Sequence, residues 1–278
     1  AVPMVAGAAA LVKQANPGFT PGQIKSAVVN TANDQVNDID ADGNSVLAGI
    51  GAAGAGKLDA GAAVQSQVTI EPATLSFGQI SGSLPSMNLT ISNFSNRTQR
   101  LNLSLDPFFT DPNASVVFSS NSVTLNPNTA ATVQVSLQGN LPGPGIYEGF
   151  VWVTSSDNSV NLHAPYLYFV GDGNPVDAYP LRGRDFAEAA GNPVNGDLLL
   201  KVVDQYGAPV PNYPVKVSNS FGDGTVTGGD GQTDSLGISF ATATVGGPGY
   251  QSFTADIGNP AIFSIFFDGR AFEPPTVD

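Results

Sequence analysis

The stretch Ala131-Thr132-Val133-Gln134-Val135-Ser136-Leu137 alternates apolar and polar side chains. A period of two places the apolar side chains on one face of an extended strand, as in an antiparallel sheet with one buried face. Similar short runs recur between Gln67 and Gly171, and turn-forming residues separate them. The sequence therefore predicts a β-sandwich of seven or eight strands over residues 66–171.

A second set of alternating runs begins near Asp197. These runs predict another sandwich over residues 194–272, followed by a tail over residues 273–278. The segment between the two sets, residues 172–193, is less periodic and mixes Gly, Pro and Asn with charged residues. We interpret it as a linker with one short strand.

The N-terminal part of the chain has a helical pattern instead. Thr20 and Gln23 form a capping box with proline at the first helical position, which predicts a helix over residues 21–31. The alanine-rich residues 4–15 predict an earlier helix, with Pro3 tolerated in its first turn. Gly7 fits a helix that packs tightly on a neighbour.

Three motifs of this part occur in a fixed order. Residues 1–7 are similar to the second half of G-T-S-M-A-x-P-x-x-x-G, residues 16–32 to N-P-x-x-T-x-x-x-I-K-x-x-L-x-x-T-A, and residues 54–64 to G-x-G-x-x-D-A-x-x-A-V. Together they resemble the end of the catalytic domain of the subtilisin-like serine peptidases, the subtilase family. The resemblance implies that residues 1–65 are a C-terminal remnant of such an α/β domain.

This resemblance also implies where the catalytic residues lie. The nucleophilic serine is expected two residues upstream of Ala1, and Ala1, Pro3 and Gly7 are the remainder of its motif. The family places the catalytic Asp and His before the serine, so we predict that this chain alone lacks the triad and is inactive. The only histidine, His163, is interpreted as a strand-surface residue. Without the central sheet of a complete domain, residues 1–64 are expected to be loosely held and sensitive to proteolysis.

The two sandwiches carry resemblances of their own. The first is similar to the fibronectin type III-like domain that follows the catalytic domain in many subtilisin-like peptidases. The second resembles a bacterial Ig-like domain of the invasin and intimin type, through V-x-D-x-x-G-x-P-V at residues 202–210 and T-D-x-x-G at residues 233–237. The predicted fold class is therefore mainly β, with two Ig/fibronectin-like antiparallel β-sandwiches after a short α-helical remnant.

The composition excludes several classes of protein. The net charge is -13 and the chain has only 10 Lys and Arg residues, so it lacks the basic face that nucleic-acid binding needs. It has no Cys, and therefore no disulfide and no thiolate metal site. No apolar run reaches the roughly 20 residues of a membrane span. Low charge with many Asn, Ser, Thr and Gly residues fits an exported bacterial protein, secreted or at the cell surface.

One segment has the spacing of a calcium loop. Asp38, Asp40 and Asp42 stand at positions one, three and five, with Gly43 at position six. Position twelve is Gly49 rather than the bidentate glutamate, which predicts weak affinity at most. The alternative is an Asp-rich surface turn that binds no ion. Apart from calcium, no cofactor is expected.

Two functions remain open at this stage. In the first, the chain is the C-terminal portion of a secreted subtilisin-like serine endopeptidase, whose parent hydrolyses protein or peptide substrates. In the second, it is an extracellular adhesion or spacer protein whose Ig-like domains bind a cell-surface protein or glycan. Both rest on resemblance and fold analogy.

Overall fold

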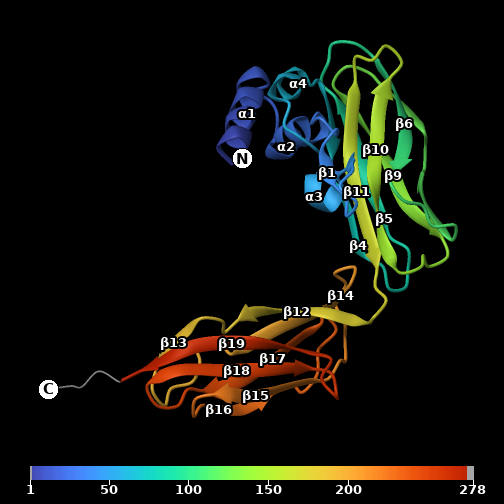
Figure 1. Ribbon diagram of the computed structural model, residues 1–278. Coiled ribbons are helices and arrows are strands. Elements are labelled where there is room, and N and C mark those ends of the chain that lie inside the picture. Colours follow the sequence, from blue (N-terminus) through green and yellow to red (C-terminus); the bar gives the residue numbers. More distant parts are fainter. Residues whose placement is uncertain (1, 274–278) are drawn as a thin grey trace. The chain divides into compact units, whose positions relative to one another are not determined.

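The computed structural model describes residues 2–273 and divides the chain into two compact units, residues 1–170 and 171–278. Figure 1 shows a β-sandwich in each unit and a short helical part at the N-terminus. The predicted fold class, mainly β with two Ig-like sandwiches after a helical segment, is confirmed. No helix among residues 2–273 combines the length and the apolar character that crossing a membrane requires.

The sandwich of the first unit has two sheets. The five-stranded sheet has the order β4 (Leu75–Gln79), β11 (Asn161–Val170), β10 (Gly145–Ser155), β6 (Gln99–Pro107) and β8 (Ser122–Leu125). The four-stranded sheet has the order β3 (Val68–Glu71), β5 (Ser86–Asn93), β9 (Thr129–Gly139) and β7 (Ala114–Phe118). The alternation seen in the sequence has the predicted effect, because Val133, Val135 and Leu137 of β9 are all buried in the core between the sheets.

Two details of this sandwich differ from the prediction. The first alternating run is two strands, β3 and β4, which belong to different sheets. Because the chain crosses between the sheets there, β4 meets β11 in the same direction and the two pair in parallel. The sheet is therefore mixed rather than purely antiparallel.

Helices occupy one side of this sandwich (Figure 1). They are α1 (Val2–Ala15), α2 (Pro21–Asn30), α3 (Ile50–Ala53) and α4 (Ala60–Gln65), with a small hairpin of β1 (Asn37–Ile39) and β2 (Ser45–Leu47) between α2 and α3. The predicted capping box is present at the start of α2. The backbone N–H of Gln23 donates to Thr20 Oγ1 at 3.3 Å, and that of Thr20 donates to Gln23 Oε1 at 2.9 Å.

The expectation of a loosely held helical segment is wrong for α2, which packs on β3 and β11. Ser26 and Asn30 of this helix are fully buried. Asn30 Nδ2 donates to the carbonyl oxygens of Ala73 and His163, both at 2.8 Å, and its Oδ1 accepts from Ser26 Oγ at 2.8 Å. Ser26 Oγ also accepts from the backbone N–H of Ile70 at 2.7 Å. The apolar periodicity of α2 in the sequence does not indicate this polar face.

The sandwich of the second unit also has two sheets, each with four strands. One has the order β12 (Pro175–Arg182), β14 (Leu198–Asp204), β17 (Ile238–Thr244) and β16 (Thr225–Gly229). The other has the order β13 (Phe186–Ala189), β19 (Phe263–Phe272), β18 (Gly249–Ile257) and β15 (Val215–Phe221).

The interpretation of residues 172–193 as a linker is wrong. This segment contributes β12 and β13, which pair with β14 and β19 respectively. Both are edge strands, where prolines and irregular periodicity are tolerated because one side makes no ladder hydrogen bonds. Because their sequences do not alternate regularly, a search for alternating apolar and polar residues did not identify them as two strands.

The motif residues of this second sandwich build its turns. The Asp204 carboxylate is buried and accepts four backbone N–H groups, those of Tyr206 and Ala208 at 2.9 Å on Oδ1, and those of Asp172 at 2.7 Å and Gly173 at 3.4 Å on Oδ2. It therefore fixes the turn after β14 and attaches the segment that enters β12 to the same point.

Candidate ligand-binding groove

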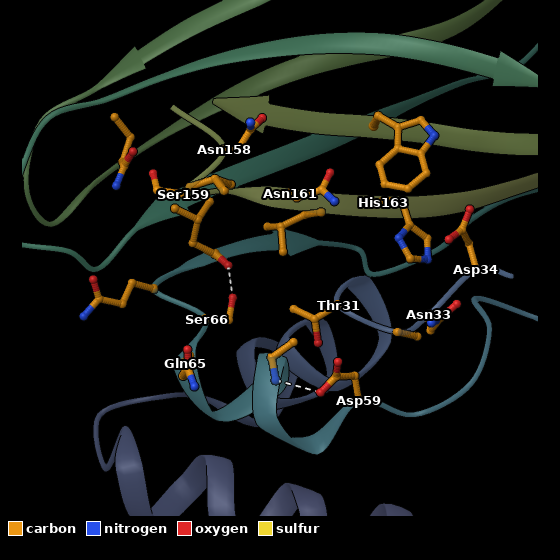
Figure 2. Close-up of a pocket in the computed structure, with 18 of the residues that line it drawn as sticks. Thr31, Asn33, Asp34, Asp59, Gln65, Ser66, Asn158, Ser159, Asn161 and His163 are labelled. Atoms are coloured by element: carbon orange, nitrogen blue, oxygen red, sulfur yellow. Dashed lines mark hydrogen bonds between the residues drawn. The ribbon is translucent and has the colours of Figure 1, made fainter. Parts of the chain in front are cut away.

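A groove with a volume of about 530 Å³ lies within the first unit, between the helical part and the outer face of the five-stranded sheet. We call it the amide groove, because Asn and Gln side chains supply much of its lining. The amide-bearing residues are Asn33, Gln35, Gln65, Gln67, Gln99, Asn158 and Asn161. Figure 2 shows the two walls: Asn158, Ser159, Asn161 and His163 come from the sandwich, whereas Thr31, Asn33, Asp59, Gln65 and Ser66 come from the helical side.

Trp152 and His163 line the groove on the sheet side. Val151 and Val153 of β10 point into the sandwich core, so the alternation directs Trp152 to the outer face. Trp152 pairs with His163 of β11 across the ladder, and their rings lie 4.9 Å apart between centroids. The ring of Phe150 lies 4.7 Å from that of His163, which completes an aromatic cluster on this face.

His163 is buried, so its interpretation as a strand-surface residue is wrong. Its Nε2 lies 2.7 Å from the carbonyl oxygen of Ala55. Because a carbonyl oxygen only accepts, Nε2 carries the proton and donates to it. Burial lowers the pKa of His163 below its ordinary value, although this hydrogen bond and the nearby Asp34 carboxylate act in the opposite direction. The neutral imidazole therefore serves as a link between β11 and the helical part.

Several polar groups of the walls are available to a ligand. Within residues 2–273, the side-chain amides of Gln65, Gln67, Asn158 and Asn161 have no hydrogen-bond partner. All four side chains are exposed. Asp59 Oδ1 accepts from the backbone N–H of Ala62 at 2.9 Å and caps α4, so this carboxylate is partly occupied.

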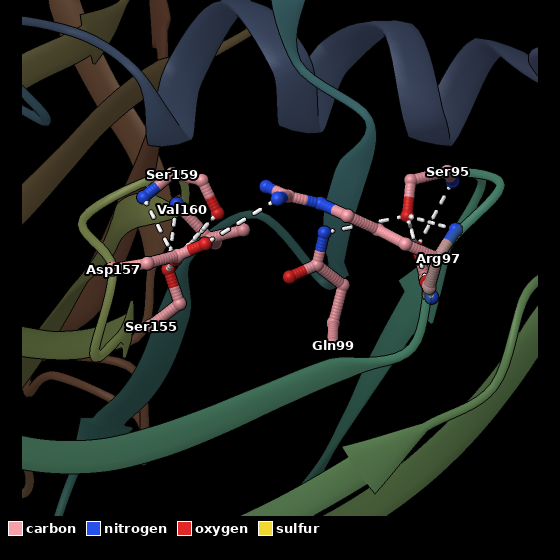
Figure 3. Close-up of polar contacts among 8 residues, drawn as sticks. Ser95, Arg97, Gln99, Ser155, Asp157, Ser159 and Val160 are labelled. Atoms are coloured by element: carbon pink, nitrogen blue, oxygen red, sulfur yellow. Dashed lines mark hydrogen bonds and ion pairs between the residues drawn. The ribbon is translucent and has the colours of Figure 1, made fainter.

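Arg97, which lines the groove, forms an ion pair with Asp157 (Figure 3). Arg97 reaches from the turn before β6 to Asp157, at 3.4 Å between nitrogen and oxygen, and both side chains are about half exposed. The pKa of Asp157 lies well below its usual range, because the hydroxyl of Ser155 donates to its carboxylate, followed by the hydroxyl and N–H of Ser159 and the charge of Arg97. The turn of residues 155–160 is therefore held in one conformation, and the charge of Arg97 is already compensated.

The three aspartates with calcium-loop spacing lie on the β1–β2 hairpin. Asp40 Oδ1 accepts the backbone N–H groups of Asp42 at 3.0 Å and Asn44 at 2.8 Å, and the Asn44 hydrogen bonds are the largest contribution that lowers the pKa of Asp40. Asp38 Oδ1 accepts from the N–H of Ile39. Among the described residues, no group of three or more His, Cys, Asp or Glu side chains is placed to hold a metal ion. Asp40 therefore stabilises the turn between β1 and β2. Weak calcium binding by Asp38, Asp40 and Asp42 stays a prediction.

The serine-motif residues lie at the start of α1. Ala1 falls outside the described residues, whereas Pro3 and Gly7 are exposed on the helix. A Cβ added to Gly7 would meet no other atom within 4 Å, so the expectation of tight packing at Gly7 is wrong within the part of the chain that is described. Exposed apolar side chains surround it on the same helix: Val2, Met4, Val5 and Leu11.

Comparison with known protein families gives a match of residues 1–51 to the Subtilase family (Peptidase_S8). The resemblance of the N-terminal part to that family is therefore confirmed, and two Ig-like β-sandwiches follow it in the same chain. The match ends before residues 54–64, where the third predicted motif lies, so that motif stays a prediction. No curated protein sequence matches the chain significantly.

Solved structures with similar folds are distant in sequence. The D0-D1 domain of intimin is 17% identical, with 74% of this chain and 97% of that chain covered and a TM-score of 0.28. CBD12 from CALX1.2 is 12% identical, with 69% and 79% covered and a TM-score of 0.46. A PapD-like domain of human CEP192 is 19% identical, with 37% and 84% covered and a TM-score of 0.31. These likenesses concern the fold and carry no function to this chain.

The amide groove was not found from the sequence. Its residues come from separate places in the chain. Thr31, Ala32, Asp59 and Ala62 belong to the motifs of the N-terminal part, but nothing in those motifs indicates a groove against the sandwich. The one available signal was Trp152. It lies between Val151 and Val153 in the sequence, and where these two valines face the core, alternation directs the Trp152 side chain outward.

Proposed function

We propose that this chain is the C-terminal portion of a secreted bacterial subtilisin-like serine endopeptidase, in which the two β-sandwiches are accessory domains. The match of residues 1–51 to the Subtilase family is the observation that carries this proposal. In the parent, a serine upstream of Ala1 attacks the peptide carbonyl, and a histidine takes its proton. The chain alone hydrolyses nothing, because its only histidine is buried and bonded to the carbonyl oxygen of Ala55.

The exposed side of α1 supports this proposal. Val2 and Met4 are 79% and 69% exposed, and Val5 and Leu11 continue the apolar surface along the helix. Such a surface is costly in water, at about 25 cal/mol for each Å². A catalytic domain that continues upstream of this helix would cover it, and the positive end of α1 would then lie near the oxyanion of the reaction.

The coding sequence upstream of Ala1 tests the proposal directly. Gly-Thr-Ser-Met immediately before Ala1, with Asp and His motifs further upstream, is the expected result. The complete protein should then react with a fluorophosphonate at that serine, and a Ser→Ala variant should not. Any other upstream sequence refutes the proposal.

A second candidate is an adhesion or spacer protein, and one feature of the second unit favours it. The outer face of the sheet formed by β18, β19 and their neighbours carries exposed aromatic side chains, namely Phe221, Tyr250, Phe266 and Phe272. Phe221 and Tyr250 pack together with ring centroids 5.3 Å apart. Exposed aromatic groups are typical of binding surfaces for proteins. If this function holds, the chain binds to cell surfaces and the double variant Phe221→Ser, Phe266→Ser does not; the peptidase function predicts no such binding.

A further inference from the structure

We propose that the amide groove binds a neutral, hydroxyl-rich ligand of the size of a mono- or disaccharide, with Trp152 as its stacking surface. The groove has about 530 Å³, within the range of roughly 300–1,000 Å³ that small-molecule sites occupy. This inference goes beyond the proposed peptidase function and does not depend on it.

The hydrogen-bonding groups of the walls match hydroxyl groups. A hydroxyl donates one hydrogen bond and accepts others, and a side-chain amide also offers both a donor and an acceptor. Gln67 and Asn161 are exposed amides with no partner among residues 2–273, one just before β3 and the other at the start of β11. Gln65 and Asn158 add two more unpartnered amides. A ring with hydroxyls on several carbons can engage several such groups at once.

The charges of the groove favour a neutral ligand over an ion. Arg97 is the only Lys or Arg among the described residues that line the groove, and its pairing with Asp157 makes its charge less available to a phosphate or sulfate group. Asp59 Oδ1 caps α4, and Asp34 Oδ2 accepts from Gln35 Nε2 at 2.8 Å. In the described part of the chain, no set of three ligating side chains could hold a metal ion. A wholly apolar ligand is also disfavoured, because it would displace the water that is hydrogen-bonded to these amides and offer no hydrogen bonds in return.

Trp152 supplies the apolar contact that distinguishes a sugar ring from other polar solutes. It is only partly buried, and its indole N–H has no hydrogen-bond partner within residues 2–273. One face of a pyranose ring carries mainly C–H groups and packs on the aromatic face, while the indole N–H can donate to a hydroxyl. The ring of His163 fixes one side of the indole, so the surface is formed before the ligand arrives.

The walls are held in place by buried bonds rather than by flexible loops. The helical wall is attached to the sheet through Asn30 and Ser26, and to His163 through the carbonyl oxygen of Ala55. The opposite turn is fixed by Asp157, which accepts from the hydroxyls of Ser155 and Ser159. A preformed site loses less entropy on binding than a site that must be ordered by its ligand.

The experiment uses the intrinsic fluorescence of the full chain, because Trp152 is the only tryptophan. The chain is titrated with glucose, galactose, mannose, N-acetylglucosamine and cellobiose. We expect a saturable change of emission with at least one of them, and saturation-transfer NMR should show the C–H protons of that sugar closest to the protein. Sodium phosphate and spermine serve as charged probes.

Two variants test the site without disturbing the core. The double variant Gln67→Ala, Asn161→Ala removes two exposed amides that line the groove and should weaken binding about tenfold to a hundredfold, the effect of losing two or more hydrogen bonds. Asn88→Ala is the matched control, because Asn88 is an exposed amide on β5 in the opposite sheet, and it should bind like the original chain. No response to any sugar, a response only to phosphate or spermine, or equal binding by the double variant would each overturn the inference.

Discussion

Replacement of Asn30 by alanine should cause the first unit to lose about 3–4 kcal/mol of stability. Three hydrogen bonds end on this fully buried side chain, to Ala73 and His163 as donor and to Ser26 as acceptor. Each contributes about 1 kcal/mol net, and buried groups that are left without a partner add a further penalty. Since domains are stable by about 5–15 kcal/mol, this loss is a large fraction of the total.

Urea unfolding followed by the fluorescence of Trp152 measures this effect, because the only tryptophan lies in the first unit and contacts His163. With an m-value of about 2 kcal/mol per M, the midpoint should fall by about 1.5–2 M. Asn30→Asp keeps the volume of the side chain but removes its donors, so it should be destabilised as well. This second variant separates the loss of hydrogen bonds from the creation of a cavity.

Gln14→Ala is the matched control, since Gln14 is an exposed amide of α1. It should change the stability by less than about 0.5 kcal/mol. A loss of less than about 1 kcal/mol in Asn30→Ala, with the m-value unchanged, would refute the argument that this buried network attaches the helical part to the sandwich.

Four further predictions concern other parts of the chain. Burial lowers the pKa of His163 on folding, so the unfolded chain takes up the proton at a higher pH than the folded chain does. The stability should therefore fall as the pH decreases below about 6.5. Urea unfolding at a series of pH values should show this slope, and His163→Gln should flatten it. Asp204→Ala should lower the thermal unfolding midpoint of the second unit in circular dichroism by more than Asp204→Asn, because four backbone N–H groups lose a buried charged acceptor; equal midpoints would contradict this role. Gly56→Ala should lower the stability of the first unit by more than about 1 kcal/mol, since Gly56 has a φ of 120° and a Cβ there would collide with the carbonyl of Asn33. Gly51→Ala is the control, because a Cβ at Gly51 would meet nothing within 4 Å, and it should be close to neutral in the same denaturation assay. Addition of calcium or of EDTA should leave the melting temperature unchanged, because Asp40 already accepts backbone N–H groups of its own turn; a rise of several degrees with calcium would restore the calcium interpretation of Asp38, Asp40 and Asp42.

The elements that the sequence predicted well are those determined by local physics. The capping box of Thr20 and Gln23 is a contact between near neighbours, and it is present at the start of α2. The alternation of β9 is equally local, because a strand with one buried face needs apolar side chains at every second position. The short strand β13 was not predicted, because it is an edge strand without clear alternation, and its pairing with β19 depends on residues more than seventy positions away.

The candidate site could not be predicted for a related reason. Alternation along β10 could have indicated that Trp152 faces outward, but nothing in the sequence indicates that α4 and the segment after α2 lie opposite it. That placement depends on Asn30, a polar residue on a helix whose apolar face is the stronger signal in the sequence. Burial of Asn30 is favourable only because the carbonyl oxygens of Ala73 and His163 are within reach, which is a property of the assembled unit and not of any segment.

The buried network also limits how the two functions can be separated. If the helical part belongs to a catalytic domain, as the Subtilase match favours, then the first sandwich is attached to that domain through Ser26, Asn30 and His163 rather than tethered by a flexible linker. A change at Asn30 would then alter both the stability of the sandwich and the position of α1, because α1 and α2 pack together in one apolar cluster. Truncation after residue 65 would remove Ala73 and His163, the acceptors of Asn30 Nδ2, and would expose Ser26 and Asn30 of α2 to water. The first sandwich is therefore a structural part of the unit that contains α1, whichever chemistry the complete protein performs.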